Sequence, residues 1–166
     1  MSADRNGTAV CPGSYDPVTN GHLDIISRAS RVFEKVVVGV VNNPVRKQKT
    51  LFSGEERREF IAEATRDLPN VEVEVFAALL VEFARDNGAI AIVKGLRAIS
   101  DFEYELEMNQ LNRRQAPEIE SLYLMAGPQY SFLSSSGVKE LATFGGNIDD
   151  LVPGPVAARL KEELSR

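Results

Sequence analysis

The sequence predicts an α/β protein built on a single doubly wound, five-stranded parallel sheet. Short apolar runs rich in β-branched residues alternate with segments of helical periodicity, and no repeat or linker-like stretch divides the 166 residues. The runs cover residues 8–11, 36–41, 71–76, 89–93 and 122–126. We therefore expect one domain over residues 1–166, in which the 43% of hydrophobic residues supply a core without disulfides or structural metals.

Apolar spacing and capping residues mark the helices between these runs. Leu23, Ile26 and Phe33 indicate the first crossover helix, and Ser53 followed by Glu56 predicts a capping box that opens the second. Further helices are expected over residues 79–86, 101–114 and 156–164.

The third apolar run sets the predicted order of the strands. It alternates valine with Glu72 and Glu74, so one of its faces reaches water, which suits an edge strand better than a central one. The first and fourth runs then become central neighbours, and the predicted strand order is 3-2-1-4-5.

The helix expected over residues 101–114 carries two apolar stripes. Phe102 and Leu106 lie on one side, whereas Tyr104, Met108 and Leu111 lie nearly opposite. We expect one stripe, with Phe102 and Leu106 the first choice, to cover the sheet and the other to meet a neighbouring subunit, but either stripe could be the one that faces the sheet. A helix wedged between elements of the same subunit explains the pattern nearly as well.

Composition excludes several classes of protein. The net charge of −5 argues against a general nucleic-acid binder, which needs a basic surface. The single cysteine, Cys11, has no partner for a disulfide, and no Cys/His spacing suits a metal, so no protein ligands to a metal are expected. The first seven residues are polar, and no apolar run approaches the ~20 residues of a membrane span. We expect a cytoplasmic protein that binds no membrane.

The segment after the first run, residues 11–22, reads Cys-Pro-Gly-Ser-Tyr-Asp-Pro-Val-Thr-Asn-Gly-His and leads into the first helix. Ligands of doubly wound sheets bind beyond the carboxyl ends of the strands, and a helix N-terminus attracts phosphate. Gly21 permits close approach there, and His22 adds a ring N–H. A histidine that only caps its helix is the alternative, but His22 is the single histidine of the chain and lies in a Gly- and Pro-rich loop. We favour a phosphate site. Neither a GxGxxG nor a GxxxxGK[ST] motif is present, which argues against hydride transfer and ordinary kinase chemistry.

Three further segments suit the same crevice. Lys94 and Arg97 flank a glycine beyond the fourth run and could be ordinary surface, but beside the histidine loop they favour phosphate ligands. The serines of residues 130–136 could cap a helix, which is compatible with ligand binding. Arg46, Lys47 and Lys49 form a basic loop after the second run, or a solvated charge run.

Together these segments resemble the nucleotidylyltransferase superfamily, whose [HT]xGH motif is matched by residues 19–22. Residues 11–22, the Lys-Gly-Leu-Arg of 94–97, the Asp-Phe-Glu-Tyr-Glu of 101–105 and the Tyr-Ser-Phe-Leu-Ser-Ser-Ser of 130–136 extend the resemblance to phosphopantetheine adenylyltransferases over essentially the whole chain. The resemblance implies a Rossmann-like nucleotidylyltransferase fold. It also implies transfer of the adenylyl group of ATP to 4'-phosphopantetheine with Mg²⁺, giving dephospho-coenzyme A and pyrophosphate. The implied assembly is a homohexamer, a dimer of trimers, with feedback by coenzyme A.

The resemblance also implies roles for individual residues. His22 would stabilise the transition state and contact ATP, while Ser14 would contact ATP and face the phosphate of the acceptor. Lys94 would bind phosphopantetheine and Leu80 would line its arm. The other implied ATP contacts are Tyr15, Gly95, Leu96, Arg97, Glu105, Tyr130, Ser131, Phe132, Leu133, Ser134, Ser135 and Ser136.

One departure from the family concerns the basic loop. The family places a substrate-binding lysine just after an Asn-Pro or Ser-Pro pair, whereas Arg46 holds that place here and Lys47 follows it. Whether Arg46, Lys47 or Lys49 binds the substrate stays open.

The chemistry agrees with the absence of a general base. The second pKa of a phosphate monoester is about 6, so the attacking group is already anionic at neutral pH. Cys11 lies in the first run and is expected to pack rather than react. The alternatives are a sister transferase that uses nicotinamide mononucleotide or CTP, and a catalytically silent nucleotide-binding module.

Overall fold

The computed structural model describes residues 7–42, 49–97 and 99–164. One parallel sheet runs through them in the order β3-β2-β1-β4-β5, as the sequence predicted. Its strands are β1 (Thr8–Gly13), β2 (Lys35–Val41), β3 (Val71–Phe76), β4 (Ala89–Leu96) and β5 (Glu120–Met125). The fourth strand is longer than the apolar run that predicted it. Lys94 and Gly95 therefore lie on β4 and not beyond it, because the strand continues through these two half-buried residues to the buried Leu96.

The described helices are α1 (Asn20–Val32), α2 (Gly54–Ala64), α3 (Leu80–Asp86), α4 (Ile99–Gln115), α5 (Ser135–Thr143) and α6 (Gly154–Leu164), with a 3-10 turn at Pro128–Tyr130. The capping box predicted at the start of α2 is present, with the Ser53 hydroxyl and the Glu56 carboxylate each accepting the other's backbone N–H. Among these helices none is long and apolar enough to cross a membrane.

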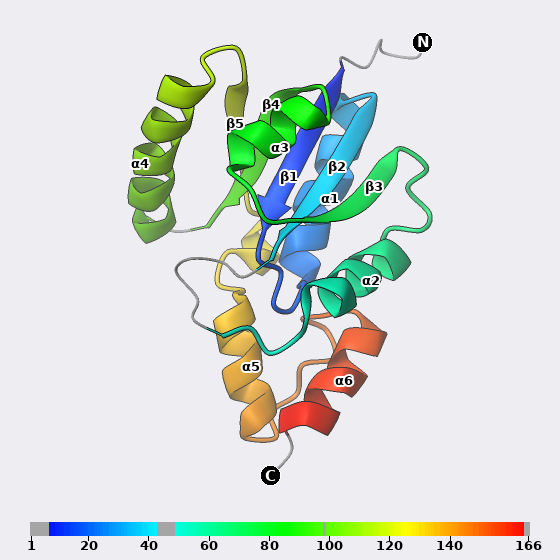
Figure 1. The fold of residues 1–166 in the computed structure, drawn as a ribbon. Coiled ribbons are helices and arrows are strands. Elements are labelled where there is room, and N and C mark those ends of the chain that lie inside the picture. Colours follow the sequence, from blue (N-terminus) through cyan, green and yellow to red (C-terminus); the bar gives the residue numbers. More distant parts are fainter. Residues whose placement is uncertain (1–6, 43–48, 98, 165–166) are drawn as a thin grey trace.

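Alternate residues of the strands face two separate cores. Ala9 and Cys11 of β1 pack in a core with α1, α2, α5 and α6, whereas Val10 packs on the other face with α3. Helices α1 and α3 lie on opposite faces of the sheet (Figure 1). β1 and β2 are therefore buried on both faces, which explains their continuous apolar runs.

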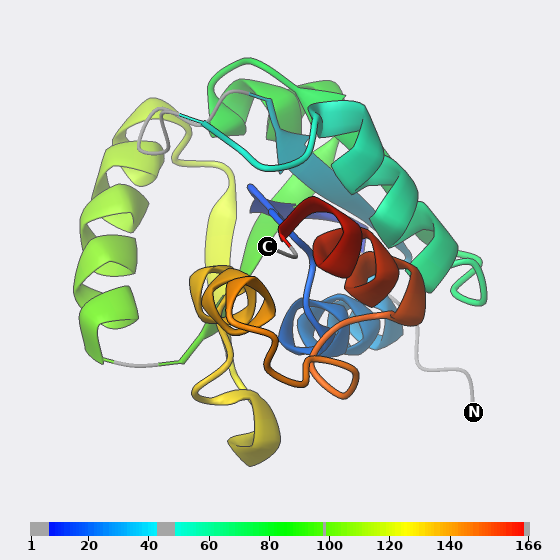
Figure 2. The ribbon, with the colours of Figure 1, turned by 90° about the horizontal axis from the view of Figure 1, so that it is seen from below.

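The carboxyl ends of the strands form one edge of the sheet, and α5 and α6 lie beyond that edge (Figures 1 and 2). The loop that follows β1 enters the same region before it begins α1. Segments far apart in the sequence therefore meet where a doubly wound sheet binds its ligands.

Helix α4 stands beside β5 at the side of the molecule (Figures 1 and 2). The expectation that Phe102 and Leu106 cover the sheet is wrong, because they are 53% and 48% exposed. Tyr104 and Met108 of the opposite stripe are more covered, whereas Leu111 is also 50% exposed. None of the side chains described in residues 101–115 is buried. The helix therefore leaves a large apolar surface without cover in the single chain.

Candidate active site

His22 forms part of a capping box at the start of α1. Its Nδ1 accepts the backbone N–H of Thr19 at 3.0 Å, and the backbone N–H of His22 donates to the Thr19 hydroxyl at 3.3 Å. Because Nδ1 is an acceptor, the proton of the neutral imidazole is on Nε2. The histidine thus caps its helix through one nitrogen and keeps an N–H on the other. The structure confirms that His22 caps its helix. This role is compatible with phosphate binding, which stays a prediction.

The serine segment lies directly beside the histidine loop. A Cβ added at Gly21 would be 3.4 Å from Cβ of Tyr130 and 3.7 Å from Cδ2 of Leu133. The Ser135 hydroxyl donates to the carbonyl of Pro17 at 2.7 Å. Two segments more than a hundred residues apart are therefore joined at the start of α1, as their positions after the carboxyl ends of β1 and β5 in one parallel sheet suggested.

Arg97 links the basic segment after β4 to the serine segment. Its Nη1 donates to the Leu133 carbonyl at 2.7 Å, and its Nε donates to the Asp101 carboxylate at 3.0 Å. Just before it, a Cβ at Gly95 would lie only 2.8 Å from Cγ1 of Ile25 on α1. Gly95 therefore lets β4 and α1 approach closely, a packing role that stands beside its predicted contact with ATP.

Lys94 and Glu105 form an ion pair at 2.9 Å, with side chains 18% and 15% exposed. The backbone carbonyl of Glu105 also accepts the Tyr123 hydroxyl at 3.3 Å, which ties α4 to β5. The residue predicted to bind phosphopantetheine is thus held by a residue predicted to bind ATP. A phosphate that approaches Lys94 competes with this carboxylate.

Three of the predicted ATP residues have buried side chains. Tyr15 is 6% exposed, donates its hydroxyl to the Cys11 carbonyl at 2.9 Å, and packs its ring edge-on against His22 at 5.0 Å. Leu96 and Leu133 are 8% and 5% exposed. Their predicted contacts with ATP could only use the main chain.

Cys11 is fully buried in β1, and burial raises the pKa of its thiol to about 12. A thiol in that state is a poor nucleophile, because the thiolate is the reactive form. The prediction that Cys11 packs in the core is confirmed.

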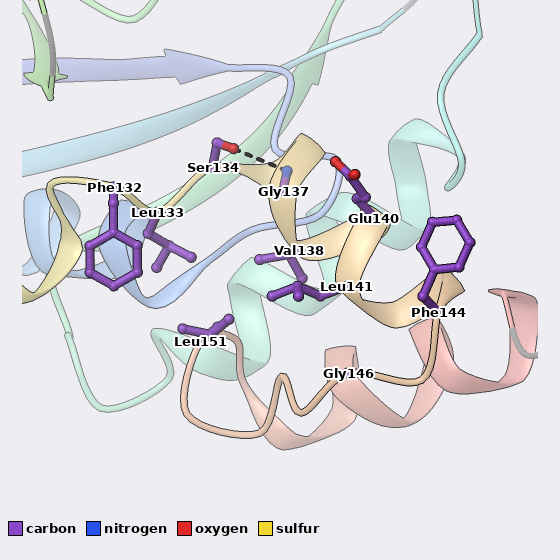
Figure 3. A pocket seen from close by; sticks show the side chains of 10 residues that line it. All are labelled: Phe132, Leu133, Ser134, Gly137, Val138, Glu140, Leu141, Phe144, Gly146 and Leu151. Carbon is purple, nitrogen blue, oxygen red and sulfur yellow. Dashed lines mark hydrogen bonds between the residues drawn. The ribbon is translucent and has the colours of Figure 1, made fainter.

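The remaining serines and their neighbours lie on the outer side of this region. Ser134 accepts the Gly137 N–H at 3.0 Å as the N-cap of α5, and Ser131 donates to the Pro128 carbonyl at 3.0 Å. Phe132 is 73% exposed, and Ser136 is also exposed. An apolar groove of about 510 Å³ runs along α5 (Figure 3), lined by Phe132, Leu133, Ser134, Gly137, Val138, Glu140, Leu141, Phe144, Gly146 and Leu151.

The residues predicted to hold the acceptor are only partly accounted for. Ser14 is half-buried in the loop after β1, and Leu80 is the half-buried first residue of α3. Lys49 is exposed, whereas Arg46 and Lys47 lie outside the described residues. The predicted contacts of these residues with substrate stay predictions.

The sequence-based predictions missed a network of buried charged side chains that connects Asp16 of the histidine loop with α2 and α5. Asp16 is 0% and Arg57 1% exposed, and Lys139 of α5 donates to Asp16 at 3.2 Å. A signal was present, because Arg57 lies four residues before the core residue Ile61 on α2 and so shares its apolar face.

Comparison with known proteins agrees with this site. Residues 10–141 match the family model described as cytidylyltransferase-like. A phosphopantetheine adenylyltransferase of Clostridium tetani is 55% identical over 148 residues, which cover 89% of this chain and 91% of the relative. The chain belongs to the phosphopantetheine adenylyltransferase family. A second member, from Rubrobacter xylanophilus, is 53% identical over 95% of both chains. Among solved structures, a bifunctional NMN adenylyltransferase/ADP ribose pyrophosphatase from Francisella tularensis matches with a TM-score of 0.68 at 19% identity, covering 95% of this chain and 49% of that one. This last likeness shows the nucleotidyltransferase fold alone.

Proposed function

We propose that the protein transfers the adenylyl group of ATP to 4'-phosphopantetheine, giving dephospho-coenzyme A and pyrophosphate. The observation that carries the proposal is the 50–55% identity to relatives named for this activity. It is supported by the start of α1, where Gly21 precedes His22 and lies beside Leu133, the residue whose carbonyl accepts Arg97. The 53% identity to the Rubrobacter protein spans 95% of both chains, so the similarity extends over nearly the full length of each.

The reaction is a direct displacement at phosphorus. An oxygen of the acceptor phosphate attacks the α-phosphorus of ATP, the bond to the bridging oxygen breaks, and pyrophosphate leaves with that oxygen. No base is needed, because the attacking phosphate is already anionic. The Nε2 proton of His22 would donate to oxygens that gain charge in the transition state, and Lys94 and Arg97 would align the phosphates.

Mg²⁺ would accompany ATP in this reaction. The residues that the structure describes hold no group of three or more His, Cys, Asp or Glu suited to a metal. We therefore propose that the ion binds on triphosphate oxygens, as hard cations do in phosphoryl transfer, with no dedicated set of protein ligands.

The test is pyrophosphate release by the purified protein with ATP and 4'-phosphopantetheine. Turnover with this pair, and at least tenfold less when CTP replaces ATP or nicotinamide mononucleotide replaces the acceptor, is the expected result. Turnover that prefers CTP or nicotinamide mononucleotide favours a sister transferase. A folded protein without turnover on any pair overturns the proposal.

We also propose that the enzyme is a homohexamer, a dimer of trimers, which works in the cytoplasm where ATP is available. The exposed apolar side chains of α4 and β5 support the assembly, since Phe102, Leu106, Leu111, Leu122 and Met125 are each at least 40% exposed. Coenzyme A carries both the adenylate and the pantetheine arm of the product. It would therefore compete for the same site and inhibit.

A further inference from the structure

Arg57 of α2 is a fully buried arginine that donates hydrogen bonds to four main-chain carbonyls. Its Nη1 donates to Ser14 at 2.6 Å and to Val41 at 2.9 Å, and its Nε donates to Phe52 at 3.1 Å and to Ser53 at 3.2 Å. These carbonyls belong to the loop after β1, the end of β2 and the start of α2. One guanidinium thus fixes the relative positions of three chain segments at the carboxyl edge of the sheet.

Asp16, two residues after Ser14, accepts hydrogen bonds from the same region to which Arg57 donates. Its two carboxylate oxygens accept the N–H groups of Leu51 and Phe52 at 2.9 and 3.0 Å, and it pairs with Lys139 of α5 at 3.2 Å. Arg57 and Asp16 therefore hold the loop after β1 against the same stretch, residues 51–53, from both directions. Every buried side-chain polar atom in the described part of the chain has a partner, so this network is complete.

Stability alone is a weak reason for such a network. Burial lowers the pKa of Arg57, and the negative charge of Asp16 opposes that shift only in part. Buried charged groups with polar partners are often replaceable by well-packed apolar residues without loss of stability, and in some proteins they serve to specify geometry. Helix α2 also has its own cap at Ser53.

The carbonyl that Arg57 binds most closely belongs to the peptide that joins Ser14 to Tyr15. A cationic donor on that oxygen polarises the peptide and makes its N–H, that of Tyr15, a stronger donor. The ring of Tyr15 is buried, so the main chain is what this residue can offer to a phosphate. The charge of Arg57 can reach a bound anion through this peptide without touching it.

We propose that Arg57 and Asp16 are positioning residues that hold the Ser14–Tyr15 peptide where it binds the reacting phosphates. The inference rests on the proposed function, because it concerns the same site. A displacement of about 1 Å at a reacting centre lowers a rate by on the order of 10²-fold. Arg57 and Asp16 would therefore act on the rate of adenylyl transfer through the Ser14–Tyr15 peptide and not through contacts of their own with the substrate.

The experiment compares Arg57→Gln and Arg57→Lys with the matched control Arg58→Gln. Arg58 is the next residue on α2 and pairs with the exposed Glu55 one turn away. Gln keeps some hydrogen bonds without the charge, and Lys keeps the charge with fewer bonds. Activity is measured well below each Tm and scaled to the folded fraction.

For Arg57→Gln we expect kcat to fall by about 10²-fold while each KM changes by less than about fivefold, the signature of lost alignment. Arg57→Lys should recover part of kcat, and Arg58→Gln should match the wild type. A wild-type kcat in folded Arg57→Gln overturns the proposal. If that variant does not fold, a wild-type kcat in Arg57→Lys overturns it instead.

Asp16→Asn gives a readout that does not use activity. Hydrogen exchange at the amides of Leu51 and Phe52 should become at least about tenfold faster at one of them, because Asn has a single acceptor oxygen. Unchanged exchange at both amides overturns the part assigned to Asp16. A wild type without turnover, but with the expected exchange pattern, refutes the proposed function and leaves the network intact, so the two failures are distinguishable.

Discussion

Replacing His22 with alanine is expected to affect stability and catalysis by different amounts. The imidazole Nδ1 accepts the Thr19 N–H at 3.0 Å, so the substitution removes one half of the capping box of α1. The loss of a cap costs about 1 kcal/mol, which lowers the Tm of a domain of this size by about 2–4 °C. The variant should therefore stay folded at assay temperature.

The catalytic loss should be larger. Removal of one preorganised donor to a developing charge lowers kcat by about 10²–10³-fold, or about 2.7–4 kcal/mol. A loss of about 1 kcal/mol in stability leaves nearly every molecule of a protein of typical stability folded, so it changes kcat very little. The capping role alone cannot produce a fall of this size.

His22→Glu separates the two roles. Glutamate is the usual third residue of a capping box and suits a helix N-terminus, so Tm should return close to that of the wild type. Its carboxylate carries no N–H and repels the triphosphate, so kcat should stay at least as low as in His22→Ala. Glu56→Ala, which removes the carboxylate of the equivalent box of α2 and no hydrogen bond to Arg57 or Asp16, should lower Tm with kcat unchanged. Near-normal pyrophosphate release by folded His22→Ala would refute the catalytic assignment.

The other predicted outcomes concern substrate division, the buried thiol and assembly. Lys94→Ala should raise KM for phosphopantetheine more than for ATP, and Arg97→Ala the reverse, because Arg97 donates to the serine segment predicted to hold ATP; equal changes in both KM values contradict this division. Native Cys11 should not react with a thiol reagent at pH 8, and the unfolding free energy should fall as pH rises from 9 toward 12, because only the unfolded thiol ionises in that range. In a Cys11→Ala variant the unfolding free energy should fall less steeply with pH over this range. An equal pH dependence in both proteins contradicts the prediction, because it shows that the folded thiol ionises as readily as the unfolded one. Sedimentation of a Phe102→Glu/Leu106→Glu variant should give species smaller than those of the wild type, since each apolar side chain contributes about 1.5–3 kcal/mol on full burial; a monomeric wild type refutes the proposed assembly.

The order of the strands could be predicted because burial leaves a direct trace in the sequence. Glu72 and Glu74 alternate with valine along β3 and are exposed, as an edge strand requires, whereas β2 beside it is a continuous run of buried residues. The end of β4 could not be predicted in this way. Lys94 and Gly95 continue the strand without an apolar side chain, because Lys94 is paired with Glu105 and Gly95 is packed against α1.

Helix α4 shows the limit of periodicity. The pattern correctly indicates two apolar stripes, but it contains no information on which stripe turns toward the rest of the chain. That choice depends on contacts such as the bond from the Tyr123 hydroxyl to the Glu105 carbonyl, which lies on neither stripe. The burial of Arg57 could not be predicted for a related reason, because charged residues on helices are usually exposed. Its burial depends on four main-chain carbonyls that come together only in the folded chain.

The site also explains how an acidic chain can bind two phosphorylated substrates. Lys94 is paired with Glu105 and Arg97 with Asp101, so the cations predicted to bind phosphate already have carboxylate partners in the structure. We expect binding of substrate to exchange these partners, so that at Lys94 the monoester phosphate of the acceptor, of charge near −2, replaces a carboxylate of charge −1. The exchange favours groups with more charge than the resident carboxylate, while the pairing keeps both side chains ordered before the substrate arrives. Local pairing of this kind, and not the net charge of −5, governs the affinity of the site for phosphate.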